Sequence, residues 1–208
     1  MIEIRSDFIW DRQAITSILS IVGAKDPSLV NHSCRVAQLA VLIAKDLQLP
    51  ENVIDRIRLA ALAHDIGKIC IEPKLLYKPG TLTKVEMDMI RRHATYGYLL
   101  LQRLNLPWRL AEIVYQHHER QDGTGYPRGL SGDSIMPEAR IIAVADFVEA
   151  LTHAHPYRKA FDIDKAIYET DNFYAKKFDT GVMDACIRII CQRFFLEGIW
   201  GITQVDEI

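Results

Sequence analysis

Apolar residues recur at the spacing of an α-helix along almost the whole chain, and this periodicity restricts its fold more than any other feature. No segment alternates apolar and polar residues over a run rich in β-branched side chains, as a half-buried strand does. We therefore predict an all-α, single-domain helical bundle with about seven or eight helices. The expected helices cover about residues 8–22, 28–47, 52–65, 83–104, 107–117, 138–152, 163–174 and 182–195.

Local residue patterns indicate where several of these helices begin and end. Pro27 can open the second helix, because proline is tolerated in a first turn. Thr83 and Glu86 have the spacing of a capping box, and Gly67 is a plausible C-cap of the third helix. Residues 122–132 contain four of the eleven glycines, so we predict a long glycine-rich loop with several unusual backbone angles there.

The composition excludes several classes of partner. The chain of 208 residues has 25 Lys and Arg against 27 Asp and Glu, whereas a domain that binds nucleic-acid backbones carries a basic excess. No apolar stretch approaches the roughly 20 residues of a membrane span. Asp7 and Asp11 lie where an export signal would have its apolar core. We predict a cytoplasmic protein whose partners are neither nucleic acids nor membranes.

Several polar residues interrupt the apolar faces of the predicted helices. His32 shares a face with Val36 and Ile43, and Asp146 follows Ile142 on a helix of Ala, Ile and Val residues. Such a side chain points inward and needs a hydrogen-bond partner or an ion, because burying it alone is costly. Seven residues have this character, on five different helices: His32, His64, Asp65, His93, His117, His118 and Asp146.

These residues are compatible with two interpretations. A single inward histidine is usually a core residue with a hydrogen-bond partner. Histidines and aspartates from several helices can also converge inside a bundle and bind metal. A sulfur-free set of imidazoles and carboxylates suits two cations that share a bridging carboxylate, such as Fe, Mn, Zn, Ni or Co.

The neighbouring residues favour hydrolysis of a phosphate ester. Two cations about 3.5–4 Å apart can hold a bridging hydroxide and clamp the oxygens of an in-line displacement. Lys68 follows Asp65 by three residues, close enough to place an ammonium beside a phosphate. Arg140 is a further cationic candidate, and Glu119 is a candidate for a hydrogen bond to a metal ligand. Each of these charged residues has a simpler interpretation as a solvated surface charge.

The motifs resemble those of a known family. After His32 come AHDIGK at 63–68, KPGxLT at 78–83, HxxxG at 93–97, HHExxDGxGYPxGL at 117–130 and VAD at 144–146. This order resembles the HD-GYP group of HD-domain phosphohydrolases over about residues 28–190. The resemblance implies an HD-type bundle with a helical extension at 1–27, a catalytic domain at 28–196 and a tail at 197–208.

The resemblance also implies an activity, which is hydrolysis of cyclic di-GMP or a related cyclic dinucleotide to linear pGpG or GMP by attack of a metal-bridging hydroxide. It implies one metal ion on His32, His64, Asp65 and Asp146, and a second on His93, His117 and His118, with Asp65 bridging. Neighbouring residues on a helix point about 100° apart, so the helix has to distort at His117 and His118. Lys68 would contact the scissile phosphate, with Asp65 the second catalytic residue, and Gly125 and Tyr126 would border the nucleotide pocket.

The chain departs from the family pattern in ways that affect metals and substrate. Ser28 stands where three-metal members have glutamate, so we expect two divalent ions, with Fe or Mn first and Zn, Ni or Co as alternatives. His155 replaces a phosphate-binding arginine, and Arg158 keeps the second cationic position. This replacement predicts weaker substrate affinity, altered selectivity or a pH-dependent rate, because histidine is only partly charged at neutral pH.

Two further functions stay open at the level of sequence. The protein is either the enzyme described above or a catalytically weak scaffold that senses nucleotides or binds proteins, for which the change at position 155 is the motive. A third interpretation keeps the fold and changes the reaction to another phosphomonoesterase or to oxygen-using di-iron chemistry. The segment 8–22 either packs on its own domain or forms a homodimer contact, and a separate sensor protein is a further possible partner.

Overall fold

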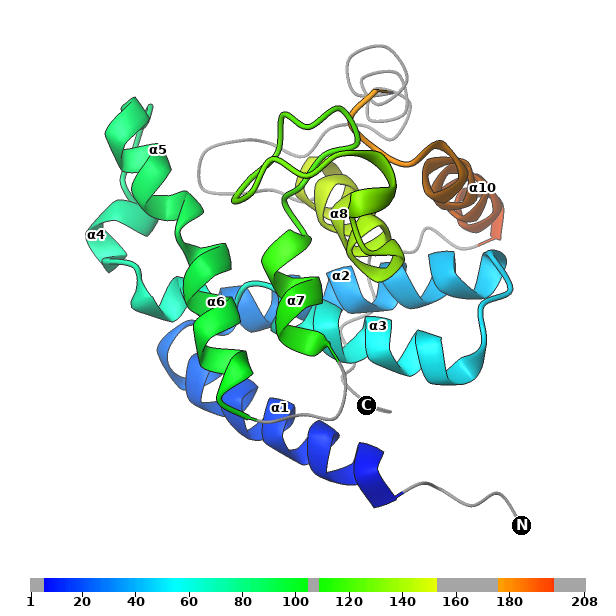
Figure 1. The fold of residues 1–208 in the computed structure, drawn as a ribbon, viewed down its shortest axis with the longest axis horizontal. Helices are drawn as coiled ribbons and strands as arrows, with labels where there is room; N and C mark the ends of the chain where they lie inside the picture. The colour runs from blue at the N-terminus through cyan, green and yellow to red at the C-terminus, as the bar shows by residue number, and fades with distance from the viewer. Residues whose placement is uncertain (1–5, 105–108, 153–175, 197–208) are drawn as a thin grey trace.

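The computed structural model of the chain describes residues 6–104, 109–152 and 176–196, and every regular element within them is a helix (Figure 1). The predicted all-α class is therefore confirmed. The α-helices are α1 (Ser6–Lys25), α2 (Pro27–Asp46), α3 (Glu51–Ala63), α4 (Pro73–Leu76), α5 (Lys84–Arg91), α6 (His93–Gln102), α7 (Leu110–Gln116), α8 (Pro137–Thr152) and α10 (Thr180–Leu196). Two short 3-10 helices, η1 (Ile66–Cys70) and η2 (Gly132–Ser134), complete the set.

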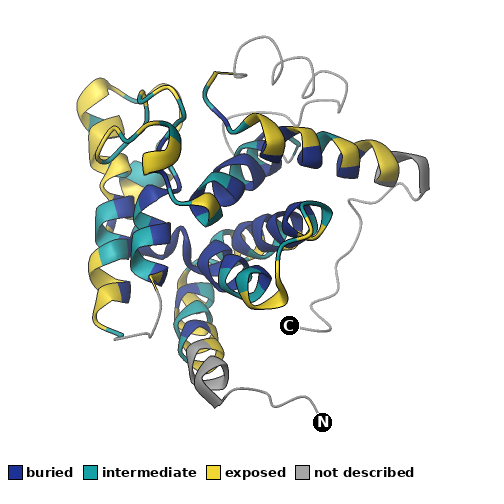
Figure 2. Ribbon diagram, turned by 45° about the vertical axis from the view of Figure 1, so that its right-hand side comes forward, coloured by how far each residue is buried: buried dark blue, intermediate teal, exposed yellow. Residues whose placement is uncertain are grey.

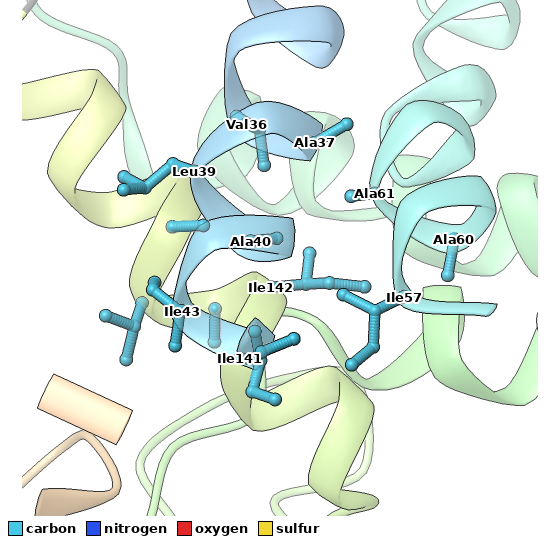
Figure 3. Close-up of a cluster of buried hydrophobic side chains, with 14 of the residues drawn as sticks. Val36, Ala37, Leu39, Ala40, Ile43, Ile57, Ala60, Ala61, Ile141 and Ile142 are labelled. Carbon is cyan, nitrogen blue, oxygen red and sulfur yellow. The ribbon is translucent and has the colours of Figure 1, made fainter. Parts of the chain in front are cut away.

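The core of the domain lies where α2, α3 and α8 meet. α2 and α3 form a helical hairpin, and α8 packs against both of them (Figure 3). Large side chains such as Ile43, Ile57 and Ile142 are fully buried there, next to small ones such as Ala40 and Ala61. The alanines let the helix backbones approach closely, and the isoleucines fill the space between them.

The remaining helices cover this core on several sides. α1 packs on α2 and α3, so Ile15 and Val22 of the predicted 8–22 segment are buried in their own domain, whereas Ile21 is 65% exposed. α10 lies along α2 and α8, and α6 packs against α7 and η1. Figure 2 shows that the buried residues of these helices face inward and the exposed ones face outward.

Two of the predicted helix starts are confirmed. Pro27 does open α2, where the Asp26 side chain accepts the backbone N–H groups of Ser28 and Leu29. The capping box of Thr83 and Glu86 at the start of α5 is present in full.

Two predictions about helix ends are contradicted by the structure. Gly67 is not a C-cap, because α3 ends at Ala63 and Gly67 lies within η1. A Cβ at Gly67 would lie 1.9 Å from the carbonyl oxygen of His93, so a close tertiary contact is the reason for this glycine. The single helix predicted at 83–104 is also wrong. It divides into α5 and α6 at Arg92, next to the point where the His93 ring bonds back to the Ile90 carbonyl.

The loop prediction at 122–132 is confirmed, since Gly123, Gly129 and Gly132 have φ values of 76°, 68° and 51°. The predicted helix at 163–174, the start of the helix predicted at 107 and the tail at 197–208 lie outside the described residues. Among the described helices, none has both the length and the hydropathy that a membrane crossing requires.

Candidate metal centre

The seven predicted ligand side chains come together in the interior of the domain, and most of them stand at helix ends. His64 and Asp65 directly follow α3, His93 begins α6, and His117 and His118 directly follow α7. The other two ligands come from helix interiors, His32 from α2 and Asp146 from α8.

The cluster consists of two groups that share one carboxylate. Asp65 lies with His32 and His64 on one side and with His93, His117 and His118 on the other. Its Oδ2 is 3.6 Å from His32 Nε2 and 3.3 Å from His64 Nε2, whereas its Oδ1 is 3.4 Å from His93 Nε2. The two oxygens of Asp65 therefore face different groups, as a bridging ligand requires.

Asp146 completes the first group. Its Oδ1 is 3.2 Å from His32 Nε2 and 3.8 Å from His64 Nε2. Burial raises the pKa of Asp146, but hydrogen bonding with His32 and electrostatic interaction with the neighbouring histidines outweigh burial and hold this pKa well below its usual value. The carboxylate is therefore ionised and can neutralise a cation.

Three of the ligand histidines are held in one orientation by the same local bond. The Nδ1 atoms of His64, His93 and His117 lie 2.7, 2.8 and 2.6 Å from the carbonyl oxygens three residues earlier. A carbonyl can only accept, so each Nδ1 carries the proton and each Nε2 is left as a free lone pair. These Nε2 atoms point into the cluster, with those of His93 and His117 3.3 Å apart.

The predicted distortion at His117 and His118 is present as the end of a helix. α7 stops at Gln116, and the two rings lie with their centroids 4.0 Å apart at 42°. Both rings therefore reach the second group although they are sequence neighbours. Burial lowers the pKa of His117 to about 3, so its imidazole is neutral and available as a ligand.

Glu149, which the sequence analysis missed, orients the first ligand of the cluster. Its Oε2 accepts from His32 Nδ1 at 2.5 Å, and its Oε1 accepts from Arg35 Nε at 2.7 Å. Burial lowers the pKa of His32, but bonding with Asp146 and Glu149 outweighs burial and raises this pKa to about 10. The surroundings of His32 thus favour a positive charge, either on the ring itself or on a cation that takes the place of the proton on Nε2. Glu149 lies three residues after Asp146 on α8, and this spacing was the available signal.

The cluster passes two tests of fit for metal ions. First, His64 Nε2 and Asp65 Oδ1 are buried without a hydrogen-bond partner within the described residues, and such orphaned atoms call for a ligand. Second, donors bound to one ion at about 2.1 Å and roughly tetrahedral or octahedral angles lie about 3.0–3.4 Å apart. The contacts within the first group are 3.2, 3.3, 3.6 and 3.8 Å, so two of them match this spacing and two lie slightly above it.

Lys68 lies at the edge of the cluster, as predicted. Its Nζ donates to Asp65 Oδ2 at 2.5 Å, and the side chain is 28% exposed, so an incoming ligand can reach the ammonium. Burial lowers the pKa of Lys68, but Asp65 more than offsets this effect and leaves the pKa raised. The amine therefore stays charged.

Glu119 anchors the glycine-rich loop instead of forming a hydrogen bond with a metal ligand. The buried Glu119 carboxylate accepts the backbone N–H groups of Arg128 at 2.7 Å and Leu130 at 2.9 Å, which corrects the predicted bond to a metal ligand. Gly125 packs on the chain at 118–120, where an added Cβ would lie 2.4–2.5 Å from backbone atoms. This close packing explains why residue 125 is a glycine, without any contact to a nucleotide.

Tyr126 lies beside the second group of ligands. Its ring stacks on His118 with centroids 4.7 Å apart at 28°, and the guanidinium of Arg91 lies 5.2 Å from the ring centroid. The bond from Tyr126 N to the His118 carbonyl, 3.1 Å long, holds the loop over the cluster. The predicted role of Tyr126 at a nucleotide pocket stays a prediction.

The remaining cationic candidates do not join the cluster in the described residues. Arg140 pairs with Asp133 at 3.0 Å and with Asp179 at 3.2 Å, so it ties α8 to the start of α10. These pairings do not support Arg140 as a cationic candidate for phosphate binding. His155 and Arg158 lie outside the described residues.

Comparison with known proteins identifies relatives of this chain. It is 44% identical over 153 residues to the 3'3'-cGAMP-specific phosphodiesterase 3 of Vibrio cholerae, covering 74% of this chain and 33% of that protein. It is 36% identical over 185 residues to a cyclic di-GMP phosphodiesterase of Thermotoga maritima, covering 88% of this chain and 50% of that protein. The chain thus spans about a third to a half of the length of these relatives.

The fold is also found among solved structures. Bd1817, an HDG"Y"P protein from Bdellovibrio bacteriovorus, matches with a TM-score of 0.67 at 20% sequence identity, over 80% of this chain and 53% of that one. At this identity the likeness concerns the fold alone. A family model described as the HD domain matches residues 17–182. Because that match runs from within α1 to the beginning of α10 and includes the whole cluster of histidines and aspartates, the chain belongs to the HD domain family, as its motifs predicted.

Proposed function

We propose that this chain is a metal-dependent phosphodiesterase that hydrolyses cyclic di-GMP or a related cyclic dinucleotide. The observation that carries the proposal is the carboxylate of Asp65, whose two oxygens face two separate sets of imidazoles, with the Lys68 ammonium 2.5 Å away. The names of the Vibrio cholerae and Thermotoga maritima relatives support a cyclic dinucleotide as the substrate class.

We infer that the cluster holds two divalent cations, with Fe or Mn before Zn, Ni or Co. His32, His64, Asp65 and Asp146 would hold one ion, and Asp65, His93, His117 and His118 the other. When bound, such ions lower the pKa of a water molecule towards about 7 and neutralise charge on a phosphate group. Ser28, whose hydroxyl donates to Asp26 at 2.7 Å as part of the α2 cap, offers no carboxylate for a third ion.

The chain itself supplies orientation and charge. Glu149 and the backbone carbonyls fix the ligand rings, so the fold determines where lone pairs point before any substrate arrives. Lys68 offers an ammonium that an equatorial phosphate oxygen can accept from, which would offset charge that develops in the transition state. The anchored loop places Tyr126 at the edge of the site, against His118.

The experiment is hydrolysis by the purified chain loaded with Mn²⁺ or Fe²⁺. Cyclic di-GMP, 3'3'-cGAMP and cyclic di-AMP are supplied separately, and products are separated by chromatography. We expect linear dinucleotide from at least one substrate, followed by mononucleotide if the second phosphodiester is also cut.

Two variants make this assay specific. Asp65→Asn keeps the shape of the shared carboxylate and removes its charge, and it should abolish turnover. Asp184→Asn removes the same charge from an exposed position on α10 and should leave the rate unchanged. Equal rates for wild type and Asp65→Asn would refute the proposal. Tight binding of a cyclic dinucleotide without product would instead favour the alternative, a nucleotide-sensing scaffold.

A further inference from the structure

A cleft lined by residues of α1 and α3 lies apart from the His/Asp cluster, since none of the cluster residues line it. Its volume is about 390 Å³, which lies in the range of small-molecule sites and exceeds what a lone inorganic anion fills. Eight described residues line it: Arg12, Gln13, Thr16, Ser17, Ser20, Arg58, Leu59 and Leu62. None of these eight is acidic.

The chemistry of the cleft is that of an anion site. Arg12 from α1 and Arg58 from α3 contribute two guanidinium groups, which donate hydrogen bonds and cannot accept them. The Nε of Arg58 is buried and has no hydrogen-bond partner within the described residues. The nearest carboxylate oxygen, Oδ1 of Asp55, is 4.0 Å away and belongs to a partly exposed side chain. Arg58 therefore carries a donor that the fold itself leaves unsatisfied.

The α1 side of the cleft presents a row of hydrogen-bonding side chains. Arg12, Thr16 and Ser20 follow one another at intervals of four residues, so they lie on one face of the helix. Gln13 and Ser17 lie beside them, and all five residues are exposed. Leu59 and Leu62 of α3 are buried and form an apolar floor.

We propose that this cleft binds a small phosphorylated molecule, with its phosphate between Arg12 and Arg58. Planar guanidinium groups match the oxygens of a phosphate in paired hydrogen bonds, and the hydroxyls of Thr16 and Ser17 supply further donors. The apolar floor and the volume accommodate an organic group attached to the phosphate. Since α3 ends one residue before His64, the ligand would contact the same helix that carries two metal ligands at its end.

Binding is measured on the full chain by two-dimensional NMR, which reports the site as well as the affinity. The probes are inorganic phosphate, guanosine monophosphate and guanosine, titrated at constant ionic strength. We expect both phosphate-bearing probes to shift the amides of residues 12–20 and 58, and guanosine to leave them in place. The monophosphate should bind more tightly than inorganic phosphate, because its organic group contacts the apolar floor, and equal binding would contradict this part of the proposal.

Three variants test the arginines. Arg58→Gln should weaken binding at least tenfold, and Arg12→Gln, on the exposed helix face, should do the same without risk to the core. Arg56→Gln is the matched control, because Arg56 lies on the same helix, bonds only the Asn52 carbonyl among the described contacts and does not line the cleft. It should change the affinity less than twofold.

Two results would overturn the proposal. One is equal affinity in Arg58→Gln, Arg12→Gln and Arg56→Gln. The other is the absence of shifts at residues 12–20 and 58 up to about 10 mM probe, a limit that corresponds to less than about 3 kcal/mol of binding free energy. Neither result depends on hydrolysis, so failure here and failure of the phosphodiesterase proposal are separate outcomes.

Discussion

Glu149→Gln keeps the shape of a buried side chain and removes its charge, so it isolates what the carboxylate does for His32. In the wild-type chain, one carboxylate oxygen accepts from His32 Nδ1 and the other from Arg35. Glutamine has a single acceptor oxygen, and the Arg35 guanidinium can only donate, so Arg35 takes that oxygen. The amide NH₂ group then faces Nδ1 and donates to it. The ring proton of His32 then moves to Nε2, where it occupies the lone pair that would bind the metal ion.

The size of the effect follows from the bond that is lost. A hydrogen bond to a charged group contributes about 1.5–3 kcal/mol. Because about 1.4 kcal/mol corresponds to a factor of ten, the ion at His32 should bind about ten to a hundred times more weakly. Loss of an outer partner of a metal-bound histidine has effects of about this size in other proteins.

The assay is calorimetric titration of Mn²⁺ into chelator-treated protein. Wild type should show two binding steps, and Glu149→Gln should weaken one of them while the other changes less than about threefold. Glu138→Gln is the control, since it removes the same charge from α8 eleven residues earlier in the sequence. The reasoning is refuted if Glu149→Gln leaves both steps unchanged, or weakens both equally.

Three smaller perturbations test other contacts. Gly67→Ala should lower the free energy of unfolding by at least about 1–3 kcal/mol, because its Cβ would lie 1.9 Å from the His93 carbonyl oxygen. Thermal denaturation measures this loss, and Gly23→Ala is the control that should be nearly neutral. A neutral result for Gly67→Ala contradicts that close approach. Glu119→Gln should speed hydrogen exchange at one of the two loop amides that its carboxylate binds, since glutamine keeps only one acceptor oxygen. Unchanged exchange would exclude this anchoring role. The folded-state pKa of Glu86 is about 2, below its usual value of 4.5. The ionised carboxylate therefore stabilises the fold above pH 4.5, and this stabilisation is lost as the pH falls towards 2. NMR should then show fraying at the start of α5, and no such loss is expected in Glu86→Gln, which lacks the carboxylate at every pH.

The ligand cluster was predictable because polar residues on apolar helix faces stand out in a sequence. Periodicity identified seven such residues, and the structure brings all seven together. Their roles as ligands stay a prediction. Glu149 escaped this reasoning, because a glutamate near the end of a helix resembles a surface charge until its partners are known. One of those partners, Arg35, is 114 residues away in the sequence.

Helix breaks were harder to predict than helices. Residues 83–104 have a continuous helical pattern, yet the structure divides them at Arg92, next to the bond between the His93 ring and the Ile90 carbonyl. The periodicity of apolar side chains does not predict such a bond between a ring and the backbone. Gly67 was misinterpreted for a similar reason, since its close approach to another helix is a tertiary contact.

The ring-to-carbonyl bonds of His64, His93 and His117 have a consequence for how sequences of this kind can change. Each bond joins a ligand to the residue three positions earlier, at Ala61, Ile90 and Val114 respectively. The four-residue segments 61–64, 90–93 and 114–117 are therefore indivisible, and an insertion inside any of them would turn its imidazole away. The ring-to-carbonyl bonds themselves place no such restriction on the residues that connect these segments.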